Sequence, residues 1–295
     1  MPSSTSSSSP EPTVSVVIGS NASGDSLEAC LGALEPQRDG IETLVLSSDG
    51  TDDRLSARYP WATFVERRGA LVPELWRDGI ELSRGRIVAL TIAQMVPADD
   101  WIETMTGEHE RHDAVGGAID PGARLRLVDW AEYFCRYARD MRPFEANAND
   151  ELPGDNASYK RALLERVADS LRTGFWEPVA HPAMRQAGAE LWHTPSLLVR
   201  QGRSEGFAAF ARQRLEHGRR YGHQRGEHFS LVRNVIGVLA APVVPFLMTA
   251  RVLGHVQAKQ RYRARAFAAL PLIFVLNLVW AVAEARGHLD KARSR

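Results

Sequence analysis

Residues 13–21 read TVSVVIGSN. This run of β-branched residues ends in Gly-Ser-Asn, which is typical of a buried strand followed by a loop. Residues 24–36 then place Leu27, Leu31 and Leu34 at helical spacing before a proline. The opening of the chain therefore predicts the first strand and the first helix of an α/β fold.

The same alternation continues to about residue 110. We expect further strands in 41–47, 61–66 and 85–94, and helices over 73–83 and after Pro97. Alternating strands and helices indicate a mainly parallel sheet flanked by helices, with right-handed crossovers. Ligands of such sheets bind beyond the carboxyl ends of the strands, so the loops at 19–23, 47–53 and 92–99 are the candidate site.

The middle of the chain is less regular. We expect a strand and turn over 114–122, an amphipathic helix over 127–142, a loop entering a helix over 153–167, and a late strand within 189–201. His109 and His112 are spaced one residue closer than the two histidines of a His-Glu-x-x-His zinc motif, so we expect them on a solvated helix face.

The C-terminal third changes character. Residues 234–250 are apolar and uncharged but contain Pro242 and Pro245, and residues 266–283 form an uncharged run of 18 residues. That length is near the minimum for crossing a bilayer. We expect an apolar helical pair that contacts membrane lipids, either spanning or re-entrant, with the prolines breaking the first segment. The basic stretch at 251–265 lies between the two apolar segments. It favours the re-entrant form, because positive residues favour the cytoplasmic side of the membrane. A buried soluble hairpin is the remaining alternative.

The composition of the chain bears on its partners, its compartment and its cysteines. The 295 residues carry 36 basic and 36 acidic side chains, which predicts no nucleic-acid partner. Residues 1–12 are rich in Ser and Pro and lack the apolar core of a signal peptide, so we expect a disordered tail and a cytoplasmic first domain. The two cysteines, Cys30 and Cys135, are expected to be unpaired and buried. The predicted division is a domain at 13–210, a basic connector at 211–233, membrane-associated helices at 234–288 and a basic tail at 289–295.

Six motifs in order give a resemblance. They are VSVVIGSNA at 14–22, VLSSDGTDD at 45–53, DGIELSRGRIVAL at 78–90, LTIAQMVPADDWI at 90–102, GDNASYKR at 154–161 and the segment 177–199. In this order and spacing they resemble the family 2 glycosyltransferases over roughly residues 13–200. The resemblance implies a GT-A nucleotide-diphospho-sugar transferase fold, a nucleotide-sugar or lipid-linked donor, and inverting transfer of a sugar to a membrane-associated acceptor.

The resemblance also implies residue roles. The nucleotide-sugar would contact Ser20, Asn21, Ser47, Asp49, Asp52 and Gln94. The acceptor would contact Asp155 and Asn156, and Glu177 stands where the family has its catalytic base. Mg or Mn would neutralise the leaving diphosphate.

The chain departs from the family at the carboxylates. Ser47 stands at the nucleotide-binding Asp, and Ile92 and Gln94 stand at the two acidic positions of Asp-x-Asp. Gln94 could coordinate a metal weakly through its amide oxygen, but Ile92 cannot. Two interpretations therefore stay open. The chain is either an active glycosyltransferase, with or without a metal, or a degenerate binding or scaffold protein.

The resemblance extends to cellular role as an expectation. The acceptor would be a lipid-linked molecule or glycan in envelope polysaccharide synthesis, at the cytoplasmic face of the inner membrane.

Overall fold

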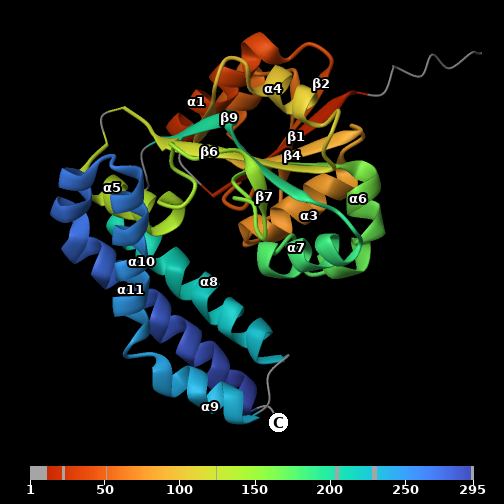
Figure 1. Cartoon of the computed structure of the whole chain (residues 1–295). Helices are drawn as coiled ribbons and strands as arrows, with labels where there is room; N and C mark the ends of the chain where they lie inside the picture. Colours follow the sequence, from red (N-terminus) through yellow and green to blue (C-terminus); the bar gives the residue numbers. More distant parts are fainter. Residues whose placement is uncertain are drawn as a thin grey trace, which may run out of the picture. The chain divides into compact units, whose positions relative to one another are not determined.

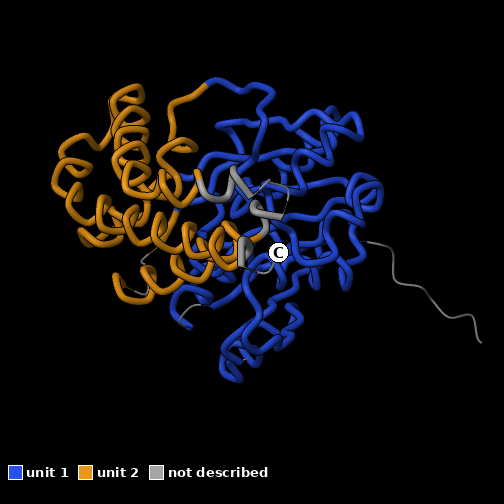
Figure 2. Tube along the Cα trace, turned by 90° about the horizontal axis from the view of Figure 1, so that it is seen from below, with its two compact units in different colours: residues 1–119, 145–200 blue, residues 120–144, 201–295 orange. Residues whose placement is uncertain are grey.

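The computed structural model describes residues 12–21, 24–50, 52–123, 125–202, 206–227 and 231–293. The predicted tail lies outside the described residues except for Pro12, as do the last two residues of the basic tail. The chain divides into two units, residues 1–119 with 145–200 (unit 1) and residues 120–144 with 201–295 (unit 2), which Figure 2 colours separately. Unit 2 therefore includes residues 120–144, which lie within the first domain expected at 13–210.

Unit 1 begins with the expected alternation of strands and helices. Four parallel strands lie in the order β3-β2-β1-β4. The elements are β1 (Val14–Ser20), α1 (Gly24–Leu34), the 3-10 turn η1 (Glu35–Gln37), β2 (Ile41–Ser47), α2 (Asp53–Arg58), β3 (Ala62–Glu66), α3 (Val72–Leu82) and β4 (Ile87–Ile92). All seven residues of β1 are buried, which fits its β-branched run.

The strand order reverses between β1 and β4. The chain moves outward from β1 to β2 and β3, then returns through α3 to β4 on the other side of β1. Right-handed crossovers in opposite directions place α1 and α3 on opposite faces of the sheet, as Figure 1 shows. Gly79 permits the close packing of α3, because a Cβ there would lie 2.2 Å from Cγ1 of Val17.

Antiparallel pairing enters the sheet after β4. β8 runs antiparallel to β4 on one side and to β6 on the other, so the sheet is mixed. The elements are β5 (Met95–Pro97), α4 (Trp101–Glu108), β6 (Ala114–Pro121), β7 (Asn147–Asn149), β8 (Asn156–Lys160), α6 (Arg161–Arg166), the 3-10 turn η2 (Ala168–Leu171), α7 (Glu177–Gln186) and β9 (Leu191–Gln201). The loop expected at the start of 153–167 is corrected, because Asn156–Lys160 forms β8 within the sheet.

Unit 2 is helical. Its elements are α5 (Leu127–Tyr137), α8 (Phe207–Glu227), α9 (Leu231–Ala240), α10 (Val244–Lys259) and α11 (Arg263–Arg293). The expected apolar pair is corrected to a single helix. Among the described residues only α11 is long and apolar enough to cross a membrane. The first apolar segment is divided between α9 and α10 by a turn at 241–243, which contains Pro242.

A polar group lies inside the helices of unit 2. The buried guanidinium of Arg214 in α8 donates to the carbonyl of Leu276 at 2.9 Å and to Oδ1 of Asn277 at 3.2 Å. Asn277 in turn donates to Oγ1 of Thr249 in α10 at 3.1 Å. Hydrogen bonds at the middle of α11 thus join it to α8 and α10.

Both cysteines are free, with Cys30 buried and Cys135 half-buried.

Candidate functional site

The carboxyl ends of β1, β2 and β4, here called the carboxyl edge, bring the predicted donor residues together. Ser20 pairs with Ser47 across β1 and β2, and Gly19 lies opposite Ile92 across β1 and β4. The main-chain N–H of Ser48 donates to the carbonyl of Ser20 at 2.9 Å, so the two loops begin side by side. The edge also coincides with the reversal of strand order, where ligands of open α/β sheets bind.

The two serines are buried at the ends of their strands, whereas the neighbouring acidic side chains differ in position. Asp49 is exposed and accepts a hydrogen bond from Oγ of Ser48 at 3.2 Å. Asn21 is half-buried directly after β1. These hydroxyl, amide and carboxylate groups could bind the polar parts of a nucleotide.

Asp52 has a local structural role as well. Its carboxylate caps α2 by accepting from the main-chain N–H groups of Arg54 and Leu55. It also lies against the start of α1, because a Cβ at Gly24 would be 2.7 Å from Oδ2 of Asp52. Its predicted contact with the nucleotide stays a prediction.

Gln94 follows β4 in a tight turn. Its Oε1 is buried and accepts no hydrogen bond from any described residue. An acceptor without a donor in a buried place is costly unless a ligand or water supplies one. Gln94 therefore offers a buried polar atom to a ligand at the carboxyl edge.

The side chains present do not fit a divalent cation held by protein carboxylates. At the Asp-x-Asp position Ile92 is a buried hydrocarbon, and Gln94 offers one neutral oxygen. Mg and Mn prefer several hard, mostly charged oxygen ligands. Within the described part of the chain, no group of three or more His, Cys, Asp and Glu side chains is placed to hold a metal ion.

The predicted base and the predicted acceptor segment lie together. Glu177 is the first residue of α7 and is half-buried. A Cβ at Gly154 would lie 2.3 Å from Oε1 of Glu177 and 3.0 Å from the ring of Trp76. Gly154 therefore allows the carboxylate to approach the chain immediately before Asp155.

Trp76 links this carboxylate to the carboxyl edge. Its Nε1–H donates to the carbonyl of Thr91 in β4 at 2.8 Å, and its ring also faces Gly19. Thr91 donates from Oγ1 to the carbonyl of Asp155 at 2.9 Å. Trp76 was not among the residues expected at the site. A buried tryptophan in an amphipathic helix is ordinarily part of the core, so its spacing carried no signal.

Asn156 is held inside the protein. Its Nδ2 donates to the carbonyls of Ala118 and Leu197, both at 2.9 Å, and its Oδ1 accepts from Nε1–H of Trp101 at 2.9 Å. The side chain is fully buried. These bonds engage both amide hydrogens and the oxygen, so its predicted contact with the acceptor would compete with them.

Tyr159 and His181 lie beyond Glu177 in the interior. The hydroxyl of Tyr159 is 2.8 Å from Nε2 of His181, which is one turn after Glu177 in α7. Burial, and next the negative charge of Glu177, raise the pKa of the Tyr159 hydroxyl well above its ordinary value. Sequence reasoning missed this pair. The spacing of four residues between Glu177 and His181 was the available signal.

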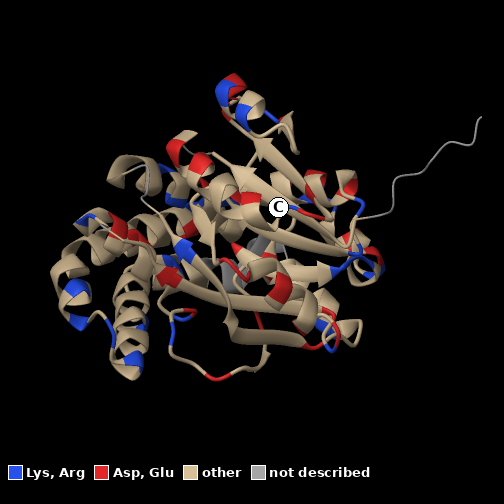
Figure 3. Ribbon diagram, turned by 90° about the horizontal axis from the view of Figure 1, so that it is seen from above, with Lys and Arg blue, Asp and Glu red and all other residues tan. Residues whose placement is uncertain are grey.

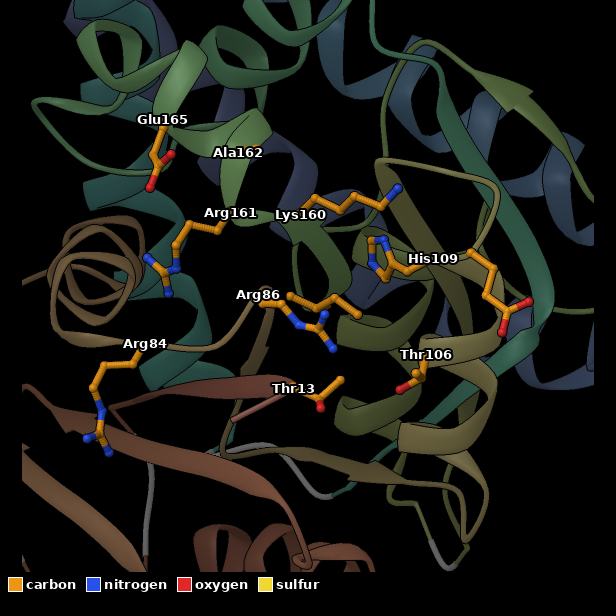
Figure 4. Close-up of a pocket in the computed structure, with 11 residues that line it drawn as sticks. Thr13, Arg84, Arg86, Thr106, His109, Lys160, Arg161, Ala162 and Glu165 are labelled. Atoms are coloured by element: carbon orange, nitrogen blue, oxygen red, sulfur yellow. The ribbon is translucent and has the colours of Figure 1, made fainter. Parts of the chain in front are cut away.

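A cavity of about 630 Å³ lies at the opposite edge of the sheet, where β1 and β4 begin and β8 ends. Figure 4 shows Thr13, Arg86, Thr106 and His109 around it. The cavity contains none of the predicted site residues. His109 is buried rather than on a solvated face, and its Nε2 is hydrogen-bonded to Oγ of Ser158 at 2.8 Å.

Comparisons with known proteins address the fold. No protein-family model matches the sequence, and no curated protein matches it. Among solved structures, the chain is similar to the mannosyltransferase PcManGT from Pyrobaculum calidifontis, solved in complex with GDP-Man and Mn²⁺. The identity is 20%, the TM-score is 0.56, and the match covers 95% of this chain and 88% of that chain.

GalNAc-T7, solved with UDP, GalNAc and Mn²⁺, matches more weakly. The identity is 14% and the TM-score 0.49, over 66% of this chain and 44% of that chain. At 20% identity and a TM-score of 0.56, the likeness to PcManGT shows the fold alone. The chain has a glycosyltransferase-like fold of the GT-A type.

Proposed function

We propose that unit 1 is a divergent family 2 glycosyltransferase that moves a sugar from a nucleotide-sugar donor to an acceptor hydroxyl. The observation that carries the proposal is the approach of the Glu177 carboxylate to the Gly154–Asp155 segment, next to the carboxyl edge. A donor lying over Ser20, Ser47 and Gln94 would have its sugar within reach of an acceptor beside Glu177.

The transfer needs one general base. The acceptor hydroxyl gives its proton to Glu177 as its oxygen forms a bond to the sugar C1. The bond between C1 and the donor phosphate oxygen breaks in the same displacement, and the nucleoside diphosphate leaves with the electron pair. Attack from the face opposite the leaving group inverts the configuration at C1.

The donor is expected to bind without a cation held by protein carboxylates. Ile92 and Gln94 supply one neutral oxygen between them, so the donor affinity rests on hydrogen bonds from this edge. Mg or Mn bound mainly by the diphosphate itself stays a second possibility. We expect EDTA to leave the donor affinity nearly unchanged, and a large loss would show that a cation is required.

The test separates donor binding from catalysis. Calorimetry with uridine, guanosine and thymidine diphosphate sugars, with and without Mn²⁺, identifies the donor. Glu177→Gln should then keep donor affinity and lower transfer by about 10²–10⁴-fold. Glu165→Gln is the matched control, because Glu165 is exposed and lines the cavity at the opposite edge.

Each failure has a distinct meaning. If no common donor binds, the transferase proposal is wrong. If Glu177→Gln transfers as well as the parent chain, only the base assignment is wrong.

The second candidate function is a membrane-bound scaffold or binding protein that performs no transfer. The hydrocarbon at position 92 and the serine at position 47 favour it, since both replace carboxylates of the family pattern. Donor binding without transfer to any lipid-linked or glycan acceptor would support this alternative.

The cellular setting is also part of the proposal. Envelope glycan or polysaccharide synthesis at the cytoplasmic face of the inner membrane fits a transferase with an apolar C-terminal helix. Fractionation of cells producing the full chain, followed by glycan analysis after gene deletion, tests it. Recovery of the chain in the soluble fraction, with unchanged glycans, would contradict it.

A further inference from the structure

Unit 2 exposes an unusual amount of hydrocarbon at the turn between α9 and α10. Leu239 is 73% exposed and Phe246 is 64% exposed. No charged residue occurs between Arg233 and Arg251. The large exposed apolar side chains of this turn are Ile236, Leu239, Val243, Phe246 and Leu247.

One side of α11 continues this surface. Phe267, Pro271, Val275, Leu278 and Val282 are exposed at intervals of three and four residues, which places them on one helix face. The ring of Phe246 contacts that of Phe274 in α11, with centroids 5.0 Å apart. The exposed residues of the turn and of α11 together are called the apolar face below.

The other side of α11 packs against α8. A Cβ at Gly218 of α8 would lie 2.9 Å from Cβ of Ala283, and one at Gly222 would lie 2.2 Å from the carbonyl of Glu284. Glycines on α8 thus let the two helices touch along the C-terminal half of α11. Figure 1 shows α8 and α11 running alongside each other.

This packing argues against α11 crossing a bilayer. α8 carries the exposed side chains Arg212, Glu216, Arg219 and Arg220. If α11 spanned the membrane with its packing intact, these charges would enter the hydrocarbon region, which is costly. If α8 stayed outside, Asn277 and the carbonyl of Leu276 would lose their hydrogen bonds to Arg214 at the middle of the span.

Exposed basic side chains flank the apolar face. Arg251 follows the uncharged part of α10, Arg263 and Arg265 precede Phe267, and Arg286 follows Val282. In Figure 3 the helices at the left carry long uncharged stretches with Lys and Arg near their ends. Apolar side chains bordered by arginine match the surface of a bilayer that contains anionic lipids.

We propose that unit 2 lies in one leaflet of an anionic bilayer through the apolar face, with α8 on the aqueous side and α11 not crossing. The partner is the boundary between headgroups and acyl chains. The proposal does not depend on transferase activity, because its readouts are lipid binding and topology.

The first experiment measures binding of the full chain to vesicles by flotation. One set contains phosphatidylcholine alone, and the other adds a minority of phosphatidylglycerol. Binding should be stronger to the anionic set, and Leu239→Glu with Phe246→Glu should lose about tenfold or more of it. Leu82→Glu is the matched control, since Leu82 is 46% exposed on unit 1 and should have no effect.

A conservative variant guards against misfolding. Leu239→Trp keeps an apolar side chain, and its fluorescence should shift to the blue and be quenched by brominated lipids when vesicles are added. Unchanged vesicle binding of the double glutamate variant overturns the proposal. A second result would also overturn it: the parent chain is a dimer that does not bind vesicles, and the double glutamate variant is a monomer. The apolar face would then join two copies of the chain.

The second experiment tests crossing directly. Ala258→Cys places an exposed thiol near the end of α10. An impermeant maleimide should label it only after cells are opened. Labelling from outside intact cells would show that the chain crosses the membrane and would overturn the proposal.

Discussion

Replacing Asn156 by alanine removes a side chain that joins three separate parts of unit 1. The change leaves the Nε1–H of Trp101 and the carbonyls of Ala118 and Leu197 without their partner, each now bonded at 2.9 Å. All three groups face a fully buried position, so solvent does not replace the bonds.

The magnitude follows from this geometry. A buried group left unsatisfied costs about 1–3 kcal/mol, with carbonyls near the lower end. Three such groups, counted conservatively, lower the free energy of unfolding by about 3–5 kcal/mol. A domain of this size is stable by about 5–15 kcal/mol, so the melting temperature should fall by roughly 10 °C.

Urea unfolding followed by tryptophan fluorescence and circular dichroism measures this loss. Asn156→Asp keeps the shape but faces two carbonyl oxygens with a carboxylate, so it should cost at least as much as alanine at neutral pH. Asn147→Ala in the edge strand β7 is the control, since Asn147 is exposed with one hydrogen bond of 3.3 Å, and we expect a change within about 0.5 kcal/mol.

A loss below about 1 kcal/mol for Asn156→Ala would refute the reasoning from buried hydrogen bonds. If stability held while acceptor affinity fell, Asn156 would be a binding residue as its motif predicts.

Three further changes test other parts of the structure. Burial lowers the pKa of His109 to about 4, below the ordinary 6.5. As pH falls, the unfolded chain therefore takes up this proton before the folded chain does. The free energy of unfolding then falls as pH drops from about 6.5 towards 4. His109→Gln should flatten that decline by about 3 kcal/mol in pH-dependent unfolding, and an unchanged slope would contradict the burial argument. Gly79→Ala should destabilise unit 1 by about 1–3 kcal/mol in the same urea assay, because its Cβ would lie 2.2 Å from Cγ1 of Val17; a neutral effect would show that α3 can move away. Asp52→Ala should cost about 1 kcal/mol through loss of the α2 cap, and a fall in donor affinity by calorimetry with unchanged stability would instead assign Asp52 to the nucleotide.

The first half of unit 1 was predictable from the sequence because its parallel strands are buried on both faces. Strands β1, β2 and β4 read as continuous apolar runs, and their shared carboxyl edge follows from parallel pairing. The sequence missed β8. Its five residues alternate polar and apolar, but Asn156 and Ser158 on the polar side are buried through hydrogen bonds rather than exposed. So short an alternation directly after Pro153 and Gly154 is equally typical of a loop.

The candidate site was predictable only as positions along the chain. Motif order located Ser20, Ser47, Gln94 and Glu177, but the contact of Glu177 with Gly154 depends on two segments more than 20 residues apart. The cavity at the opposite edge draws its lining from separate strands and helices, so no local pattern announced it. The sequence predicts two long apolar helices, but the part of the chain that the structure describes has one. The first apolar segment is divided because α9 ends just before Pro242, so neither of its parts is long enough to cross a membrane.

The interleaving of the two units has a consequence during synthesis on the ribosome. Helix α5 carries the aromatic residues Trp130, Tyr133, Phe134 and Tyr137, which are buried in the finished unit 2. α5 packs against α11, which begins about 125 residues after α5 ends. At a synthesis rate of about 5–20 residues per second, roughly 6–25 s pass between the end of α5 and the start of α11. A chain that ends near residue 200 never makes it, so we expect such a fragment to aggregate through α5, and nascent chains to need a chaperone or a membrane surface during that interval.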